Sequence, residues 1–181
     1  MYQNQLSAAN AEVAIVGEFE MNEAISALSQ ALDNWQTDVE YGDTSREVNP
    51  DAKGDKMNIV TPDKANAVFT AGLSFAMNDD DADTAALELG NFILGGGTLS
   101  SRLGNRIRQQ EGLSYGVTSS ISIPDEGNDA RFTINAITNP LNIDAVETAA
   151  MEELTRFIND GPTAEEVADA QSAWLESQSR S

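Results

Sequence analysis

The chain of 181 residues contains no histidine and no cysteine. Catalytic zinc sites rely heavily on His or Cys ligands, and hydroxyl or thiol nucleophiles usually need a histidine base. The lack of cysteine also excludes a disulfide framework. The sequence therefore excludes a self-sufficient zinc, Ser-His or Cys-His enzyme, and we predict that this chain alone is catalytically inactive.

Basic residues and long apolar runs are also scarce. Ten Lys and Arg stand against thirty Asp and Glu, which gives a net charge of -20. Such a field repels nucleic acid and anionic membranes, so we expect neither as a partner. It is typical of a soluble acidic protein, and long-range attraction of basic peptides is the functional alternative. No apolar run approaches the roughly 18 residues of a membrane span, and the first residues lack the pattern of a signal peptide.

Apolar periodicity predicts strands and helices in the first half of the chain. Residues 12–19 (EVAIVGEF) form a short apolar run that is typical of a buried strand. The next helix is predicted to begin at Asn22 as its cap and to carry one apolar stripe that ends at Trp35. After a polar loop, strand-like stretches follow between residues 57 and 77 (MNIV and AVFTAGLSFAM), and a helix is predicted over residues 84–94.

The second half shows clearer boundaries. Three glycines at 95–97 are expected to break the helix, and a second helix is predicted from about residue 100 to 111, with Ser100 and Ser101 as caps and Gly112 as its terminating glycine. Residues 114–123 then alternate as a half-buried strand, with Tyr115 and Val117 on the same inner side. Residues 131–138 pair back on it as an antiparallel partner.

Two helices are predicted to close the chain. Residues 142–159 form a long amphipathic helix that Gly161 ends, and residues 163–166 (TAEE) form a capping box that opens the last helix. The order of strands and helices predicts an α+β fold: a two-layer α/β sandwich with a mostly antiparallel sheet and helices packed on one face.

One segment departs from the acidic composition of the chain. Residues 90–110 contain no acid, yet Arg102, Arg106 and Arg108 lie within seven residues of one another, just after the three glycines. A helix dipole favours cations near its C-terminal end, so a purely structural explanation stays open. The alternative is peptide recognition: Arg108 in the last helical turn and Tyr115 on the following strand can donate hydrogen bonds to a carbonyl or to a developing oxyanion.

Residues 94–117 (LGGGTLSSRLGNRIRQQEGLSYGV) closely resemble the C-terminal, zinc-free domain of pitrilysin/insulinase-family zinc metallopeptidases, including bacterial proteases similar to mitochondrial processing peptidase. The shared pattern is a Gly-rich turn, Ser-Arg-Leu, Ile-Arg and Gly-Leu-Ser-Tyr. Softer matches lie at residues 61–77, 131–140 and 152–171. The resemblance implies the two-layer half-domain that is typical of LuxS and the processing peptidases.

The resemblance also implies how such a domain works. In this family a zinc-bearing N-terminal domain or subunit closes with the C-terminal domain around a peptide substrate, so zinc is expected in that partner and no cofactor in this chain. Arg108 and Tyr115 are implied to bind the peptide near the scissile bond and to help stabilise the tetrahedral intermediate. Weaker substrate contacts are expected at four further residues: Gly95, Gly96, Gly97 and Arg102. The family's C-terminal domain usually runs further, so residues 1–181 are expected to be a single domain that is truncated at its C-terminal end.

Two other functions stay open at this point. Some family members no longer cleave peptides and serve as scaffold subunits of larger complexes. A stand-alone anion-binding module centred on Arg102, Arg106 and Arg108 is the other alternative. Bacterial relatives of this type are often exported, so the resemblance implies a periplasmic or otherwise exported protein, and self-association into a homo-oligomer is left open.

Overall fold

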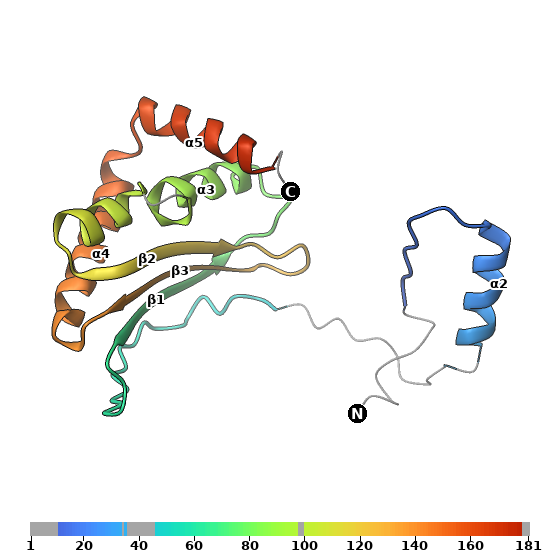
Figure 1. Ribbon diagram of the computed structural model, residues 1–181, viewed down its shortest axis with the longest axis horizontal. Coiled ribbons are helices and arrows are strands. Elements are labelled where there is room, and N and C mark those ends of the chain that lie inside the picture. Colours follow the sequence, from blue (N-terminus) through green and yellow to red (C-terminus); the bar gives the residue numbers. More distant parts are fainter. Residues whose placement is uncertain (1–10, 34, 36–45, 98–99, 179–181) are drawn as a thin grey trace. The chain divides into compact units, whose positions relative to one another are not determined.

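The computed structural model describes residues 11–33, 35, 46–97 and 100–178. Contacts divide the chain into two units, Met1–Thr44 and Ser45–Ser181, and each is described by itself. The second unit contains the sheet and most of the helices (Figure 1).

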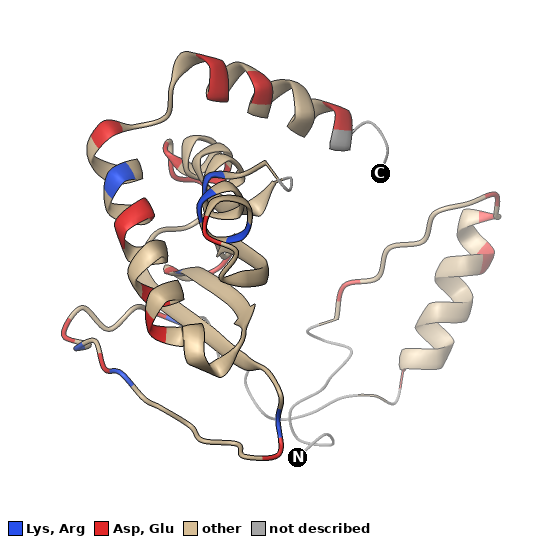
Figure 2. Ribbon diagram, turned by 60° about the vertical axis from the view of Figure 1, so that its left-hand side comes forward, with Lys and Arg blue, Asp and Glu red and all other residues tan. Residues whose placement is uncertain are grey.

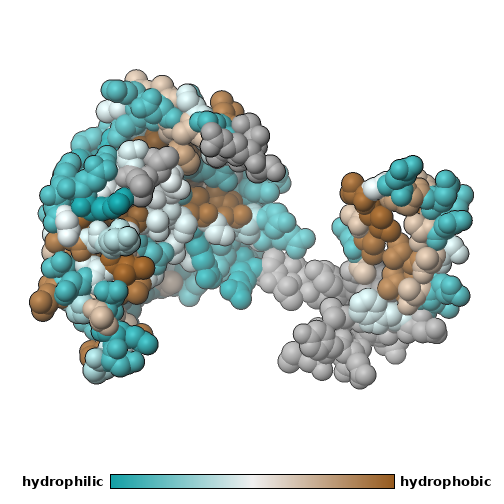
Figure 3. Space-filling model, viewed as in Figure 1, coloured by the Kyte–Doolittle hydropathy of each residue, from teal (hydrophilic) through white to brown (hydrophobic). Residues whose placement is uncertain are grey.

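The first unit contains helix α2, which spans Met21–Leu32. Ile25, Leu28 and Leu32 of the predicted stripe share one side of this helix, and Figure 3 shows apolar side chains gathered on the face in view, but Trp35 lies beyond the end of the helix. Two predictions were wrong. Asn22 is not the cap, because the helix begins at Met21 and its N-cap is Glu20. Residues 12–19 are irregular, since no described strand pairs with them to satisfy their backbone N–H and C=O groups.

The sheet of the second unit has three antiparallel strands in the order β1-β3-β2. These are β1 (Ala67–Ala76), β2 (Ser114–Ser122) and β3 (Asp129–Thr138). The predicted pairing of the last two strands is confirmed. The stretch MNIV at residues 57–60 was wrongly expected to be strand-like; it is irregular and exposed. β1 and β2 are therefore the two edge strands among the described residues.

Helices cover one face of this sheet (Figure 1). α3 (Thr84–Asn91) continues directly into η2 (Phe92–Gly96), and η3 (Gly104–Gln110) precedes β2. The short η4 (Pro140–Asn142) leads into α4 (Ile143–Asp160), and α5 (Ala164–Gln178) follows. The prediction that the glycines break the first helix at residue 95 was wrong, because Gly95 and Gly96 lie inside η2.

Both η2 and η3 are π-helices, in which an N–H group bonds the carbonyl five residues earlier. Gly97 N bonds Phe92 O at 3.0 Å, and Glu111 N bonds Arg106 O at 3.2 Å. The wide turn at the end of η2 requires a glycine at position 97, because a Cβ there would come within 2.7 Å of the Phe92 ring. A residue pattern read with α-helical spacing therefore misplaces side chains in this part of the chain.

The core lies between the helices and the inner face of the sheet. Its fully buried large side chains are Leu103, directly before η3, Ile107 in η3, Ile134 in β3 and Val146 in α4. The alternation of β3 places every even-numbered residue from Ala130 to Thr138 on this inner face. The α+β class and the packing of helices on one face of an antiparallel sheet are thus confirmed.

Helix ends follow the predicted local chemistry. Gly112 and Gly161 have φ angles of +62° and +71°, which glycine adopts without strain. At the start of α5, Glu166 N donates to Thr163 Oγ1 at 3.2 Å and Thr163 N donates to a Glu166 carboxylate oxygen at 2.7 Å. Ser101 Oγ accepts from Gly104 N at 3.3 Å. The predicted capping box and the Ser101 cap are confirmed.

Candidate functional site

A β-bulge at the start of β2 sets the direction of Tyr115. Ser114 pairs with Thr138 and Gly116 pairs with Ile137, so Tyr115 is the extra residue with no partner on β3. The prediction that Tyr115 shares the inner side with Val117 was therefore wrong. Ser114 and Val117 are buried, whereas Tyr115 is 91% exposed. The phenol lies outside the core and is accessible to a ligand.

The hydroxyl of Ser114 holds this bulge together. Ser114 is only 6% exposed, and its Oγ lies 2.7 Å from both Gly116 O and Ile137 O and accepts from Gly116 N at 3.2 Å. Opposite it, the Thr138 hydroxyl donates to Leu113 O. These two buried hydroxyls thus contact backbone groups on both sides of the extra residue. The sequence suggested no role for Ser114, because the bulge that this serine stabilises follows only from the pairing with β3.

Arg108 lies in the last turn of η3 and is exposed. Its guanidinium forms no hydrogen bond or ion pair with the residues that the structure describes. Gly112 reverses the chain after η3, and Leu113 N bonds Ile107 O at 2.9 Å, so the connection to β2 is short and tied to the helix. Arg108 and Tyr115 are thus both accessible on either side of this connection, and their joint action on a peptide stays a prediction.

The guanidinium of Arg102 is hydrogen-bonded to acceptors within the chain. Its Nε and one terminal nitrogen donate to the Glu166 carboxylate at 2.7 and 2.8 Å, and that same nitrogen donates to Gly161 O at 3.0 Å. The guanidinium also lies 5.0 Å from the centre of the Phe157 ring. The hydrogen bond to Glu166 raises the pKa of Arg102 and burial opposes this, while the same bond lowers the pKa of Glu166 to about 2. Arg102 therefore joins the segment before η3 to the turn between α4 and α5.

Arg106 is also paired with carboxylates. It donates to Glu111, and at 2.9 Å to Glu152 on α4. The hydrogen bond to Glu111 is the main cause of its raised pKa. Glu111 lies five residues after Arg106, which is the spacing that a π-helix brings to one side. Of the three arginines in the acid-free segment, Arg108 alone lacks a carboxylate partner among the described residues.

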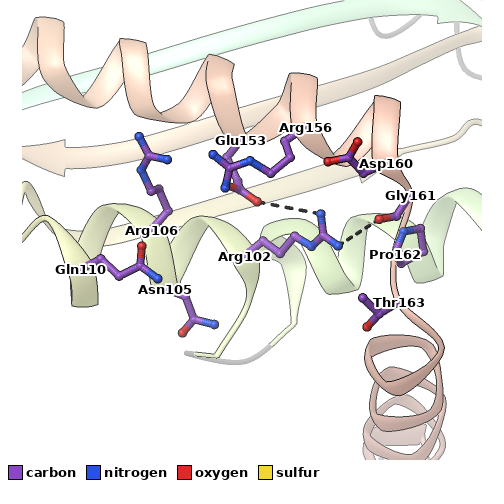
Figure 4. Close-up of a pocket in the computed structure, with 10 residues that line it drawn as sticks. All are labelled: Arg102, Asn105, Arg106, Gln110, Glu153, Arg156, Asp160, Gly161, Pro162 and Thr163. Atoms are coloured by element: carbon purple, nitrogen blue, oxygen red, sulfur yellow. Dashed lines mark hydrogen bonds and ion pairs between the residues drawn. The ribbon is translucent and has the colours of Figure 1, made fainter.

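A cleft of about 530 Å³ lies between η3, the end of α4 and the turn to α5 (Figure 4). Its charged lining consists of Arg102, Arg106, Arg156, Glu153 and Asp160. Glu153 is buried, and Arg156 donates to it at 2.9 Å while Arg102 lies 4.0 Å away. Glu153 was not predicted as a site residue, although its position on the apolar stripe of α4 indicated a buried acid. The arginines of this cleft already have carboxylate neighbours, so their charge is compensated within the chain.

The three glycines have unequal surroundings. Gly95 is buried, and a Cβ there would come within 2.7 Å of both the backbone nitrogen and the hydroxyl of Ser119 on β2. Gly95 therefore permits close packing of η2 on the sheet. Gly96 and Gly97 are exposed beside the first residues of η2. Their contact with a substrate, like that of Arg102, stays a prediction.

The residues that the structure describes do not assemble a catalytic metal site. The sequence has no His or Cys, and the described ranges contain no group of three or more Asp or Glu that could hold a metal ion. Within the same ranges, no helix is both long and apolar enough to cross a bilayer. Charges are spread unevenly over the second unit: α5 carries acids and no Lys or Arg, whereas η3 carries arginines (Figure 2).

Three comparisons with known proteins bear on this arrangement. A curated relative, the non-peptidase homolog YmxG of Helicobacter pylori, is 28% identical over 167 residues, which cover 92% of this chain and 37% of the relative. The crystal structure of a peptidase M16 inactive domain from Pseudomonas fluorescens matches with 30% identity and a TM-score of 0.59, over 65% of this chain and 28% of that one. The periplasmic protease PqqL of Escherichia coli shares the fold at 17% identity and a TM-score of 0.58, over 89% of this chain and 18% of PqqL.

The family model of the peptidase M16 inactive domain matches residues 1–173, nearly the whole chain. The chain spans about a third of the length of the curated relative. The fold and this match agree: the chain belongs to the family of peptidase M16 inactive domains, the non-catalytic domain of peptidase-like proteins.

Proposed function

We propose that this chain binds an extended peptide and supports the transition state of its hydrolysis by a separate zinc-bearing domain or subunit. The observation that carries the proposal is the contrast between three arginines. Arg102 and Arg106 are held by carboxylates, while Arg108 is exposed and has no partner in the described part of the chain. Tyr115, on the other side of a short connection, is almost fully exposed.

The chemistry of the pair suits oxygen ligands. A guanidinium and a phenol both donate hydrogen bonds, and neither has to lose a proton to do so. The carbonyl oxygen of the scissile bond accepts such bonds, and they strengthen as negative charge develops on that oxygen during water attack. Arg108 and Tyr115 would thus hold the peptide and stabilise the tetrahedral oxyanion, while the attacking water is activated elsewhere.

The test uses the full-length protein together with its zinc-bearing domain or subunit. Arg108→Ala and Tyr115→Phe should each lower turnover of a peptide substrate about 100-fold, in the range of a lost oxyanion donor, while bound zinc is unchanged. Arg131→Ala is the matched control, because Arg131 pairs with Asp129 near the opposite end of the sheet. Wild-type turnover in both variants would refute the proposal.

A scaffold without peptidase activity is the second candidate. It is favoured by one specific observation, the description of the YmxG relative as a non-peptidase homolog. Zinc content and peptide cleavage by the full-length wild-type protein separate the two functions, since a scaffold has no need for either. An anion-binding module is disfavoured, because a phosphate at Arg102 or Arg106 would have to displace carboxylates already bound there.

The periplasm is our proposal for the compartment. PqqL, described as a periplasmic protease, supports it only through a shared fold. Fractionation of the source cells with an antibody to this chain tests it, and recovery of the protein in the cytoplasmic fraction would refute it.

A further inference from the structure

The bulge at the start of β2 puts Ser114 where an unbroken strand would put Tyr115. Along the rest of β2 the pairing with β3 is continuous up to Gly116, which pairs with Ile137. One further step would pair residue 115 with Thr138 on the inner face of the sheet, but Ser114 takes that place instead. The strand therefore has two alternative registers, which differ in whether the phenol lies under the helices or outside the core.

The side chain of Ser114 favours the bulged register. Its Oγ lies 2.7 Å from both Gly116 O and Ile137 O and accepts from Gly116 N at 3.2 Å, and these contacts require Ser114 to lie opposite Thr138. The hydroxymethyl group is small enough to be buried there, whereas the alternative register would have to enclose the whole ring of Tyr115. The serine thus stabilises the arrangement that leaves the phenol exposed.

The hydroxyl of Thr138 fixes the other side of the bulge. It donates to Leu113 O, and the N–H of Leu113 donates to Ile107 O at 2.9 Å. Both backbone groups of Leu113 are therefore bonded, one to β3 and one to η3, the helix that carries Arg108 in its last turn. Thr138 is only 4% exposed, so water has little access to this bond.

We infer that Ser114 and Thr138 are positioning residues, whose buried hydroxyls hold Tyr115 outside the core and fix the backbone that joins it to Arg108. The inference rests on the proposed function of Arg108 and Tyr115 and adds two residues that act on the peptide only through them. Misplacement of a binding or reacting group by about 1 Å can lower a rate about 100-fold. Loss of either hydroxyl therefore lowers turnover without removing a group that contacts the peptide.

The test measures peptide turnover by the full-length protein with its zinc-bearing domain or subunit, at a temperature where circular dichroism shows each variant to be folded. Ser114→Ala and Thr138→Val should each lower kcat/KM about 10-fold, the effect of a partial misplacement, while bound zinc is unchanged. Ser119→Ala is the matched control. Ser119 lies on the same strand, is 3% exposed and donates to Asn91 Oδ1 at 2.8 Å, so its loss should lower the urea midpoint but leave turnover at the wild-type value.

Two further readouts separate positioning from a general loss of stability. In a double-mutant cycle, Ser114→Ala should change kcat/KM by less than about 2-fold when Tyr115→Phe is already present, because the phenol hydroxyl that it positions is gone. A 3-fluorotyrosine incorporated in place of Tyr115 should give one narrow fluorine NMR resonance in the wild type and in Ser119→Ala. It should give a shifted or second resonance in Ser114→Ala and in Thr138→Val.

The outcomes separate this inference from the proposed function. If Ser114→Ala lowers kcat/KM equally with and without Tyr115→Phe, its effect does not act through the phenol and the inference is overturned. Wild-type turnover, or an unchanged fluorine resonance, in both Ser114→Ala and Thr138→Val also overturns it, while a slow Tyr115→Phe leaves the proposed function standing. Wild-type turnover in Tyr115→Phe itself refutes the proposed role of Tyr115, and the inference fails with it. Should Ser114→Ala not fold, Thr138→Val, which keeps the shape of its side chain, decides by the same cycle.

Discussion

Neutralising Glu166 should remove a large, pH-dependent part of the stability of this domain. Its carboxylate accepts two hydrogen bonds from Arg102, at 2.7 and 2.8 Å, and one from Thr163 N at 2.7 Å. The bond to Arg102 is the largest cause that lowers the Glu166 pKa from 4.5 to about 2, and burial opposes it. Glu166→Gln keeps the size of the side chain but removes the charge that these donors stabilise.

The magnitude follows from the pKa change. One pKa unit corresponds to about 1.4 kcal/mol, so a fall from 4.5 to about 2 sets an upper limit of about 3.5 kcal/mol. The side chain is 31% exposed, and solvent screening reduces the expected value to about 1–2 kcal/mol. Because folding lowers this pKa, the stabilisation is complete above pH 4.5 and is lost as the pH falls from 4.5 through 2.

The assay is urea unfolding, followed by far-ultraviolet circular dichroism, at several pH values between 7 and 3. Glu166→Gln should be less stable than wild type by about 1–2 kcal/mol at pH 7, and this difference should shrink steadily below pH 4.5. Glu165→Gln is the matched control, because Glu165 is exposed in the same helical turn and forms no ion pair with the described residues. A difference between wild type and Glu166→Gln that stays constant from pH 7 to pH 3 would refute the reasoning.

Two further predictions concern the packing around β2. Gly95→Ala should lower the free energy of unfolding by about 1–3 kcal/mol in urea titrations, because the new Cβ would lie 2.7 Å from Ser119; an unchanged stability would contradict this. Ser114→Ala should cost about 1–3 kcal/mol and speed hydrogen exchange at the Gly116 amide, because that amide loses its partner at the bulge. Ser120→Ala, which removes an exposed hydroxyl pair on the same strand, should change neither quantity by more than a small fraction of this.

Elements whose signals are local could be predicted well. The long helix α4, the capping box before α5 and the terminating glycines at 112 and 161 each depend on a few neighbouring residues. The strand expected at residues 12–19 depends on a partner strand far away in the sequence, and apolar composition cannot supply one. The π-helices were missed for a related reason, since apolar spacing alone does not distinguish a five-residue hydrogen-bond pattern from a four-residue one.

The candidate site was predictable in composition but not in geometry. The sequence singled out Arg108 near a helix end and Tyr115 at a strand start, and the structure leaves both side chains accessible. The direction of Tyr115 was not predictable, because a single extra residue shifts the alternation of a strand from one face to the other. The buried hydroxyl of Ser114, which closes that bulge, follows only from the register with β3.

The different surroundings of the three arginines explain why this acidic domain can still present a cation to a ligand. Glu152 pairs with Arg106 and lies 46 positions after it, and Glu166 pairs with Arg102 and lies 64 positions after it. Sequence spacing could therefore not assign these partners. A ligand carbonyl that approached either arginine would compete with a bound carboxylate, and breaking such a pair leaves an uncompensated charge. At Arg108 the competing acceptor is water alone, as far as the described residues extend. Of the three arginines, Arg108 would therefore lose least on forming the hydrogen bond to a peptide that we propose for it.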